Sequence, residues 1–416
     1  MLLIFVPNIT ERIKYTFKIC FNNVVKTDYK ITDNFDLYQK TNCPKFWYSE
    51  KQEDSSFGIF SNGLLFLSSF PFKQNPIYSK NDIFEFVFLI VTQSQHYTNT
   101  KDKIEFDITK PIINIKINDF IFKLTKIYPD LQVELPVFQF IPTIDVDIAF
   151  KYKYKNFFRT LAWFIKDFFS LKFEEVKERF LCIIGLKSDI WNNFEEIIEL
   201  HNHYILKPIF FFLVGKRGKF DKNISIKKSA MQNIIKKISE RSYEIGFHSS
   251  AAGVDNFNLW KIEKQNLEKI IGKKITKTRQ HYIKLNFPQT FQNYLELGIL
   301  DDFSLIYPEN PGFRLGVTVP IKFFDLEKNQ ETNLTLYPSV IMDVSLKKYK
   351  NFTIEEAKKF CREIVSYYKK YGGIFVSVWH NESLSNDPNW KDWRIVYRFL
   401  LEEILISNST NKFNSN

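Results

Sequence analysis

The sequence has few of the residues that mark several classes of protein. It contains four cysteines, Cys20, Cys43, Cys182 and Cys361, which lie far apart and form no CxxC pair. This excludes a disulfide framework and a cysteine-based zinc knuckle, and it favours a reducing compartment. Only ten of the 58 basic residues are arginine. Because nucleic-acid readers rely on clustered arginine, we expect no nucleic-acid partner.

Long hydrophobic runs are also lacking. The longer apolar runs, such as residues 209–214, fall far short of the roughly 20 residues that cross a bilayer, so we expect no transmembrane segment. At the N-terminus, Met1 is followed by five apolar residues, with no basic residues before them and no small-residue cleavage site after them. This pattern predicts a first β-strand rather than a signal peptide and, together with the cysteines, a cytoplasmic protein.

The chain has an excess of aromatic and lysine side chains. Its 416 residues include 44 Phe, 20 Tyr and 7 Trp, and its formal net charge is +11. Because Phe, Tyr, Lys, Ile and Asn share AT-rich codons, genome composition acting on tolerant positions explains this excess better than a functional surface does. The length predicts two or three domains of roughly 100–200 residues each.

The pattern of apolar and polar residues changes near residue 138. Residues 1–138 contain short apolar runs broken by polar residues, and they predict a compact α/β or α+β domain. The run at 84–91 fits a buried strand or a buried helix. Residues 139–406 alternate short apolar strands with helical segments, which is typical of a parallel sheet or barrel. The polar tail at 407–416 predicts disorder.

The predicted elements of residues 139–406 can be located by their apolar patterns. Strands are predicted at 140–150, 208–215, 243–250, 302–307, 336–346 and 372–380, and helices at 189–202, 227–239, 259–271, 288–297 and 353–371. The last helix begins with a capping box, because Thr353 is followed three residues later by Glu356.

Polar side chains stand at several predicted strand ends, where the reactive groups of parallel sheets gather. Asp and His are suitable ligands for a hydrolytic metal ion, a second carboxylate can take a proton from water, and a histidine can protonate a leaving group. A lone Asp-x-Asp pair more often caps a turn, but the accompanying histidines favour a metal site. The candidates are Asp145, Asp147, His248, Asp302, Asp343 and His380, and the segment RQHY adds Arg279, His281 and Tyr282.

Four motifs, in this order along the chain, resemble those of polysaccharide deacetylases of carbohydrate esterase family 4. TIDVD at 143–147 resembles the family motif T-F-D-D, and HSSAA at 248–252 resembles the start of the motif H-[ST]-x-x-H. RQHY at 279–282 resembles the motif R-x-P-Y. VSVWHN at 376–381 resembles the C-terminal motif in which a histidine follows an apolar strand. The resemblance covers residues 139–405. With GFRLG at 312–316, the set is similar to a Bacteroidetes-type branch of bacterial deacetylase-like proteins that have an N-terminal domain of unknown function.

The resemblance implies a distorted (β/α)7 barrel that removes an N- or O-acetyl group from a saccharide or glycan precursor. The cofactor it implies is a divalent metal, with zinc as the expected ion. It also implies a set of roles: Asp145 as general base, Asp147 and His248 as metal ligands, His380 as general acid, and Arg279 as the residue that positions the base.

Further residues are candidates for substrate binding. The backbone near Tyr282 would help to form an oxyanion hole, and the rings of Tyr282 and Trp379 are candidate sugar platforms. Asp302 and Asp343 could orient a histidine or bind sugar hydroxyls. Arg314 could contact an anionic sugar.

The sequence departs from the family pattern at two places. Val146 separates Asp145 from Asp147, whereas the two acids of the family are adjacent, so the base and ligand roles could be exchanged. Ala252 stands where the family has its second ligating histidine, and alanine cannot bind a metal. We hypothesise that His281, which stands where the family has proline, supplies the missing ligand.

Two alternatives remain open beside the main interpretation, whose partner is an acetylated saccharide. The missing ligand at Ala252 fits a catalytically degenerate deacetylase fold that binds glycans or acts as a scaffold. Residues 151–172 interleave basic and aromatic side chains, which fits a peripheral membrane protein. For this stretch, a core-packed amphipathic helix is the favoured prediction.

Overall fold

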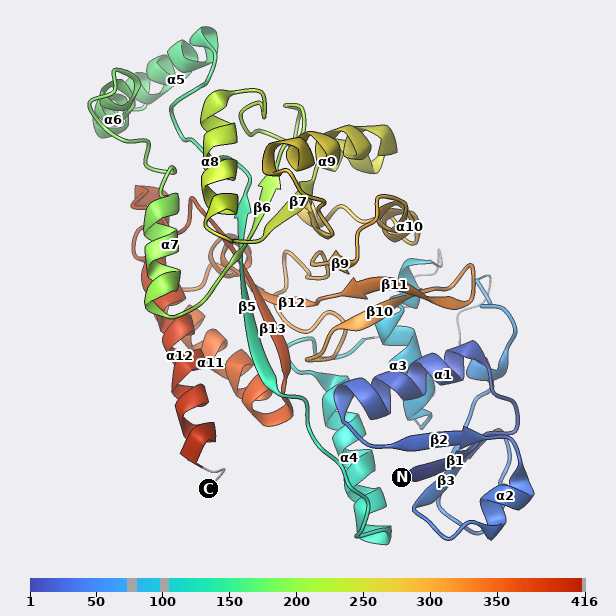
Figure 1. Cartoon of the computed structure of the whole chain (residues 1–416). Coiled ribbons are helices and arrows are strands. Elements are labelled where there is room, and N and C mark those ends of the chain that lie inside the picture. Colours follow the sequence, from blue (N-terminus) through green and yellow to red (C-terminus); the bar gives the residue numbers. More distant parts are fainter. Residues whose placement is uncertain (73–80, 98–104, 414–416) are drawn as a thin grey trace. The chain divides into compact units, whose positions relative to one another are not determined.

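Residues 1–72, 81–97 and 105–413 are described by the computed structural model of the chain (Figure 1). The boundary predicted at residue 138 lies in strand β5 (Phe138–Val146), where the chain passes from one structural unit to another. The first unit comprises Met1–Phe140, Leu285–Val340 and Glu363–Val376, and the second comprises Ile141–Lys284, Ile341–Arg362 and the residues from Ser377 onward.

The N-terminal part of the first unit contains a parallel sheet with the strand order β2-β1-β3-β4. Strand β1 (Leu2–Phe5) is the strand predicted at the N-terminus, and all four of its side chains are buried. The sheet is completed by β2 (Tyr29–Thr32), β3 (Lys45–Ser49) and β4 (Gly58–Phe60).

The helices of this part are α1 (Glu11–Lys18), α2 (Phe35–Lys40), α3 (Ile83–Val91) and α4 (Ile112–Ile127). The ambiguous run at 84–91 is therefore a buried helix. The Asp82 carboxylate caps it, because it accepts hydrogen bonds from the N–H groups of Phe84 and Glu85 at 3.1 and 3.0 Å. The Phe84 ring centroid lies 4.7 Å from that of Phe17 and 5.6 Å from that of Phe120, so aromatic side chains fill this core.

Residues 285–340 add α10 (Gln289–Glu296), the short β9 (Asp301–Asp302) and the antiparallel pair β10 (Ile321–Asp325) and β11 (Gln330–Leu336). The strand predicted at 302–307 is wrong beyond Asp302. The Asp302 carboxylate accepts hydrogen bonds from the N–H and hydroxyl of Ser304 at 3.1 and 2.5 Å, and this local turn ends the strand.

The second unit is built around parallel strands. In order from β5, the strands β6 (Ile209–Leu213), β7 (Ile245–Ser249) and β8 (Lys277–Gln280) pair in parallel. On the other side of β5 follow β13 (Gly373–His380) and β12 (Ser339–Met342), of which the residues from Ser377 and from Ile341 onward belong to this unit. Every residue of β6 is buried, as expected for a parallel strand covered on both faces. The α/β class is confirmed, whereas the (β/α)7 barrel stays a prediction.

Helices between and after these strands are α7 (Phe194–His203), α8 (Ser229–Glu240), α9 (Phe257–Ile271), α11 (Ile354–Tyr371) and α12 (Trp393–Phe413). The capping box of α11 is present: Thr353 N–H donates to the Glu356 carboxylate at 2.8 Å, and Glu356 N–H donates to Thr353 Oγ1 at 3.3 Å. Helix α12 extends to Phe413, into the segment predicted to be a disordered tail, whose last three residues lie outside the described part.

Helices α5 (Phe157–Phe169) and α6 (Phe173–Ile183) follow β5 in the second unit. Of residues 151–172, which were predicted to form a core-packed helix, Phe157–Phe169 are helical. The predicted core packing is wrong, because Phe158 and Phe169 are each 80% exposed. Of the helices in the described ranges, none has the length and apolar character to cross a membrane.

Candidate metal centre

Three predicted metal ligands converge at the carboxyl ends of neighbouring strands. Asp147 follows the last residue of β5, His248 lies on β7, and His281 comes directly after β8. Asp147 Oδ1 lies 3.0 Å from His248 Nε2, and Asp147 Oδ2 lies 3.3 Å from His281 Nε2. The three ligand atoms lie within 4.8 Å of one another, which is a suitable arrangement for one metal ion.

The second ring nitrogen of each histidine is fixed by the protein. His248 Nδ1 lies 2.8 Å from the carbonyl oxygen of Arg279, and His281 Nδ1 lies 2.8 Å from Asp221 Oδ1. Because these oxygens accept hydrogen bonds, each Nδ1 carries the proton, and each Nε2 is left to bind a proton or a metal. This is the arrangement by which proteins orient metal-binding imidazoles.

The charge distribution of the cluster fits a bound cation. Asp147 Oδ1 is buried and, among the described residues, receives no hydrogen bond. It lies 3.0 Å from His248 Nε2, and either a proton on that nitrogen or a cation bound beside the two atoms would satisfy both. Burial lowers the pKa of His281, but the charges of Asp147 and Asp221 outweigh burial and raise it to about 9. A metal would therefore compete with a proton at this site.

Asp145 lies on β5 and Asp147 directly follows the strand, and their spacing of two residues predicts that both carboxylates lie on the same side. Residues i and i+2 of a strand share a face, so Asp145 and Asp147 point toward the same edge while Val146, between them, is fully buried. The inserted valine is therefore compatible with a site that uses both acids.

Asp145 is held by a buried arginine rather than by the histidine cluster. Arg279 Nη1 donates to Asp145 Oδ1 at 2.6 Å and to Thr143 Oγ1 at 2.7 Å. The other carboxylate oxygen, Asp145 Oδ2, lies 3.7 Å from His248 Nε2. Asp147 therefore lies closer to the two histidines than Asp145 does, and the assignment of base and ligand stays a prediction.

His380 lies at the end of β13 and faces the same cluster. Its Nδ1 lies 2.8 Å from Asp343 Oδ1, its backbone N–H donates to Asp343 Oδ2 at 2.9 Å, and its Nε2 lies 3.6 Å from Asp147 Oδ2. Burial lowers the pKa of His380, but the charge of Asp343 foremost, together with Asp147 and Asp145, raises it to about 10. A protonated histidine is suited to the acid role, and Asp343 orients it.

The backbone after His281 adopts an uncommon conformation. Tyr282 and Ile283 have φ values of 59° and 52°, so two successive non-glycine residues lie in the left-handed region. Such residues cost on the order of 1–3 kcal/mol each and cluster at functional sites. The Tyr282 side chain is 56% exposed, and its ring centroid lies 4.5 Å from that of His281 and 5.2 Å from that of Phe220.

Comparisons with known proteins cover both parts of the chain. Residues 2–112 match a family of unknown function (DUF7033), and no curated protein matches the chain. Among solved structures, it is similar to a protein from Mycobacterium smegmatis assigned as a polysaccharide deacetylase, with 14% identity, a TM-score of 0.40, and coverage of 64% of this chain and 82% of that chain.

Two further structures are similar at lower scores. The polysaccharide deacetylase from Bacillus cereus has 12% identity and a TM-score of 0.30, with coverage of 54% of this chain and 84% of that chain. The Xyl-CE4 domain of a multidomain xylanase from the hindgut metagenome of Trinervitermes trinervoides has 10% identity and a TM-score of 0.28, with coverage of 52% and 77%. Scores this low establish no activity for this chain.

Asp302, Arg314 and Trp379, which were also predicted to contact the substrate, each contact other residues of the protein. Asp302 and Arg314 belong to the first unit, where Asp302 binds Ser304 and Arg314 donates to Gln93 Oε1 at 2.9 Å. Their roles toward a sugar stay predictions. Trp379 is fully buried, with its ring centroid 4.6 Å from that of Tyr397. A ring inside the core offers no face to a sugar, so we leave Trp379 out of the proposed substrate surface.

Asp221 is the functional residue that the sequence analysis missed. It lies in the loop after β6, and its carboxylate binds His281 Nδ1 and accepts hydrogen bonds from the N–H groups of Ala251 and Ala252 at 3.0 and 3.2 Å. The rule that reactive groups follow parallel strands would have included it, since it follows β6 by eight residues.

Replacing Asp221 with alanine should weaken metal binding without removing a ligand. His281 loses the partner that fixes its ring, and loss of such an outer partner typically costs roughly 10–100-fold in metal affinity. Competition with a chromogenic chelator would measure the change. Asp255→Ala, which removes an exposed carboxylate of the same unit, is the matched control. An affinity for Asp221→Ala equal to that of the control would contradict the supporting role.

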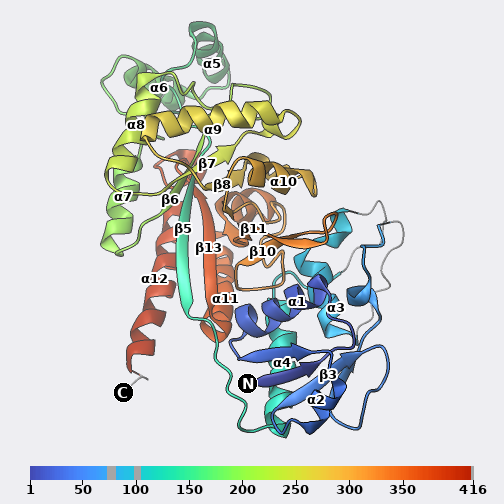
Figure 2. The same cartoon turned by 45° about the vertical axis from the view of Figure 1, so that its right-hand side comes forward.

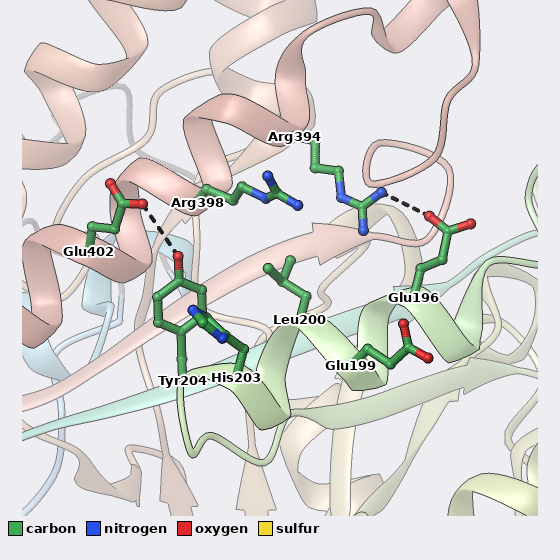
Figure 3. A pocket seen from close by; sticks show the side chains of 8 residues that line it. All are labelled: Glu196, Glu199, Leu200, His203, Tyr204, Arg394, Arg398 and Glu402. Atoms are coloured by element: carbon green, nitrogen blue, oxygen red, sulfur yellow. Dashed lines mark hydrogen bonds and ion pairs between the residues drawn. The ribbon is translucent and has the colours of Figure 1, made fainter.

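A hollow in the second unit lies between α7 and α12 (Figure 3) and has a volume of about 380 Å³. Arg394 Nη1 donates to Glu196 Oε2 at 2.8 Å, and the Tyr204 hydroxyl donates to Glu402 Oε1 at 3.4 Å. The hollow shares no residue with the metal cluster. Its polar groups form bonds between the two helices, which indicates helix packing rather than a reaction site.

Proposed function

We propose that the second unit is a metal-dependent deacetylase that removes an acetyl group from a saccharide or glycan precursor. The observation that supports this proposal is the arrangement of the side chains around three potential metal ligands. A carboxylate, Asp145, and a histidine, His380, lie beside these ligands, and each of the two is bound by a partner residue. Asp145 is held by Arg279, and His380 is held by Asp343. Hydrolysis of an amide or ester needs these two groups as base and acid.

The residues of the site would divide the work as follows. Asp147, His248 and His281 would hold a divalent cation, for which we propose zinc. A cation bound there would act as a Lewis acid and make water more acidic. The Asp147 side chain remains 29% exposed, so the cluster is open on one side to solvent and substrate.

Proton transfer would involve the two groups beside the ligands. Arg279 directs one oxygen of Asp145 away from the cluster and leaves the other to accept a proton from the attacking water. His380, charged because of Asp343, would donate its Nε2 proton to the departing sugar nitrogen or oxygen. The backbone at Tyr282 is the proposed donor to the acetyl oxygen on which charge develops.

The proposed substrate surface consists of exposed rings beside the ligands. Tyr282 is 56% exposed and Phe220 is 41% exposed, and their rings lie close together in an edge-to-face contact. The motif resemblance supports a saccharide, and aromatic faces are suited to the apolar side of a sugar ring. A cytoplasmic location and an acetylated precursor as the substrate form part of the same proposal.

The degenerate, glycan-binding alternative depends on the lost ligand at Ala252. His281 weakens that alternative because its Nε2 lies 3.3 Å from Asp147 Oδ2 and can serve as the third ligand. We therefore favour the enzyme.

The test is release of acetate from an acetylated oligosaccharide, such as an N-acetylglucosamine oligomer and an O-acetylated xylan fragment. We expect turnover that dipicolinate abolishes and added zinc restores. Zinc-loaded protein that binds these oligosaccharides without releasing acetate would favour the binding module instead.

A further inference from the structure

Helices α5 and α6 form a hairpin that projects from the rest of the second unit in both views (Figures 1 and 2). Of the 29 large apolar side chains that are exposed in the described residues, 13 lie between Phe157 and Leu186. Nearly half of the exposed large apolar side chains are thus concentrated in 30 residues. A concentration of exposed apolar side chains indicates a site of interaction.

The hairpin buries one ion pair and exposes large apolar side chains. Asp167 and Arg179 are buried and form an ion pair at 2.5 Å, while Phe158 and Phe169 are each 80% exposed. Helices that face water bury their apolar side and expose their charges. Apart from this buried pair, the hairpin exposes both phenylalanines and charged side chains such as Lys166 and Lys172, and such an amphipathic surface is suited to the boundary between water and an apolar medium.

Polar contacts join the base of the hairpin to the rest of the unit. The Asp189 carboxylate accepts hydrogen bonds from the N–H groups of Lys151, Tyr152 and Lys153 at 2.8, 2.8 and 2.9 Å. Lys151 Nζ also forms an ion pair with Asp387 at 3.0 Å. These contacts fix the base of the hairpin within the second unit.

The charges around the hairpin are mainly positive. Between Lys151 and Ser188 there are nine Lys and Arg residues and four Asp and Glu residues. At the base, a pocket of about 500 Å³ is lined in the described structure by Lys153, Lys155 and aromatic or neutral side chains, without an acidic residue. An anionic group is the ligand that such a pocket would attract.

We propose that the α5–α6 hairpin docks on the surface of an anionic phospholipid bilayer. Its phenylalanines and Trp163 would enter the boundary between headgroups and acyl chains, and its lysines would contact the headgroups. With 13 and 11 residues, the two helices are too short to cross the bilayer.

A second copy of the chain fits this surface less well. In a symmetric dimer the same patch meets itself, so the excess of positive charge would face an equal excess. A bilayer with acidic lipids offers both the apolar medium and the opposite charge. The proposal does not depend on the deacetylase activity.

Flotation with lipid vesicles tests the proposal. We expect the full chain to bind vesicles of phosphatidylcholine with phosphatidylglycerol at least about tenfold more strongly than vesicles of phosphatidylcholine alone, and to lose binding in high salt. The double variant Phe158→Ser/Phe169→Ser should bind at least about tenfold less, because two exposed rings no longer enter the lipid. Unchanged thermal unfolding would show that this variant is folded.

The matched control removes two exposed apolar side chains elsewhere. Phe122 is 60% exposed and Ile205 is 94% exposed, so Phe122→Ser/Ile205→Ser should bind like the unaltered chain. Failure of the full chain to bind the anionic vesicles would overturn the proposal. A dimer in solution that only Phe158→Ser/Phe169→Ser dissociates would also overturn it, in favour of a contact between two copies.

Discussion

Replacing His281 with alanine should reduce the bound zinc from about one equivalent per chain to nearly none. His281 Nε2 lies 3.3 Å from Asp147 Oδ2, and Ala252 cannot take its place. The variant keeps only Asp147 and His248, and two protein ligands rarely retain zinc against a chelator. Metal analysis of protein purified in parallel would measure the loss, and acetate release should fall with it.

His203→Ala is the control for this experiment, because His203 is an exposed histidine of the same unit. It should retain zinc and activity. An unchanged zinc content in His281→Ala would show that the third ligand comes from elsewhere, and the metal centre described above would then be wrong.

Asp145→Asn should reduce the rate of acetate release by roughly 10²–10⁴-fold, the usual contribution of a positioned base. The amide oxygen can still accept the hydrogen bond that Arg279 now donates to Asp145 Oδ1, so the local structure should persist. The amide cannot take a proton from water. Initial rates at saturating substrate, together with the zinc content, would measure both effects.

The zinc content decides between the two possible assignments of the acids. If Asp145 is the base, Asp145→Asn keeps its zinc, and Asp147→Asn loses it. The opposite pattern would mean that the roles are exchanged. Retention of more than about a tenth of the rate in Asp145→Asn would remove Asp145 from the base role altogether.

Much of this site could be predicted because its residues are rare and follow apolar runs. The chain has only six histidines, and His248 and His380 end strands whose apolar sequences are easy to recognise. The same reasoning located Asp145 and Asp147. The strand order could not be derived in this way, because it depends on which strands pair and not on any one strand.

The partners of the histidines were harder to predict. Asp221 and His281 are 60 positions apart, and only the loop after β6 brings them together. Asp343 was recognised as a strand-end acid, but its pairing with His380 required the structure. For residues 151–172 the sequence left a core-packed helix and a membrane-surface helix open, since an apolar helical pattern looks the same whether its face meets a protein core or a lipid surface.

The segment around Ala252 contributes to the cluster through its main chain and not through a side chain. Its side chain is exposed and binds nothing in the cluster, yet its N–H holds the carboxylate that orients His281. Every residue except proline supplies that N–H group. A histidine is therefore not needed at position 252 for this hydrogen bond, and in the proposed site His281 would supply the ligand that the family motif places at position 252.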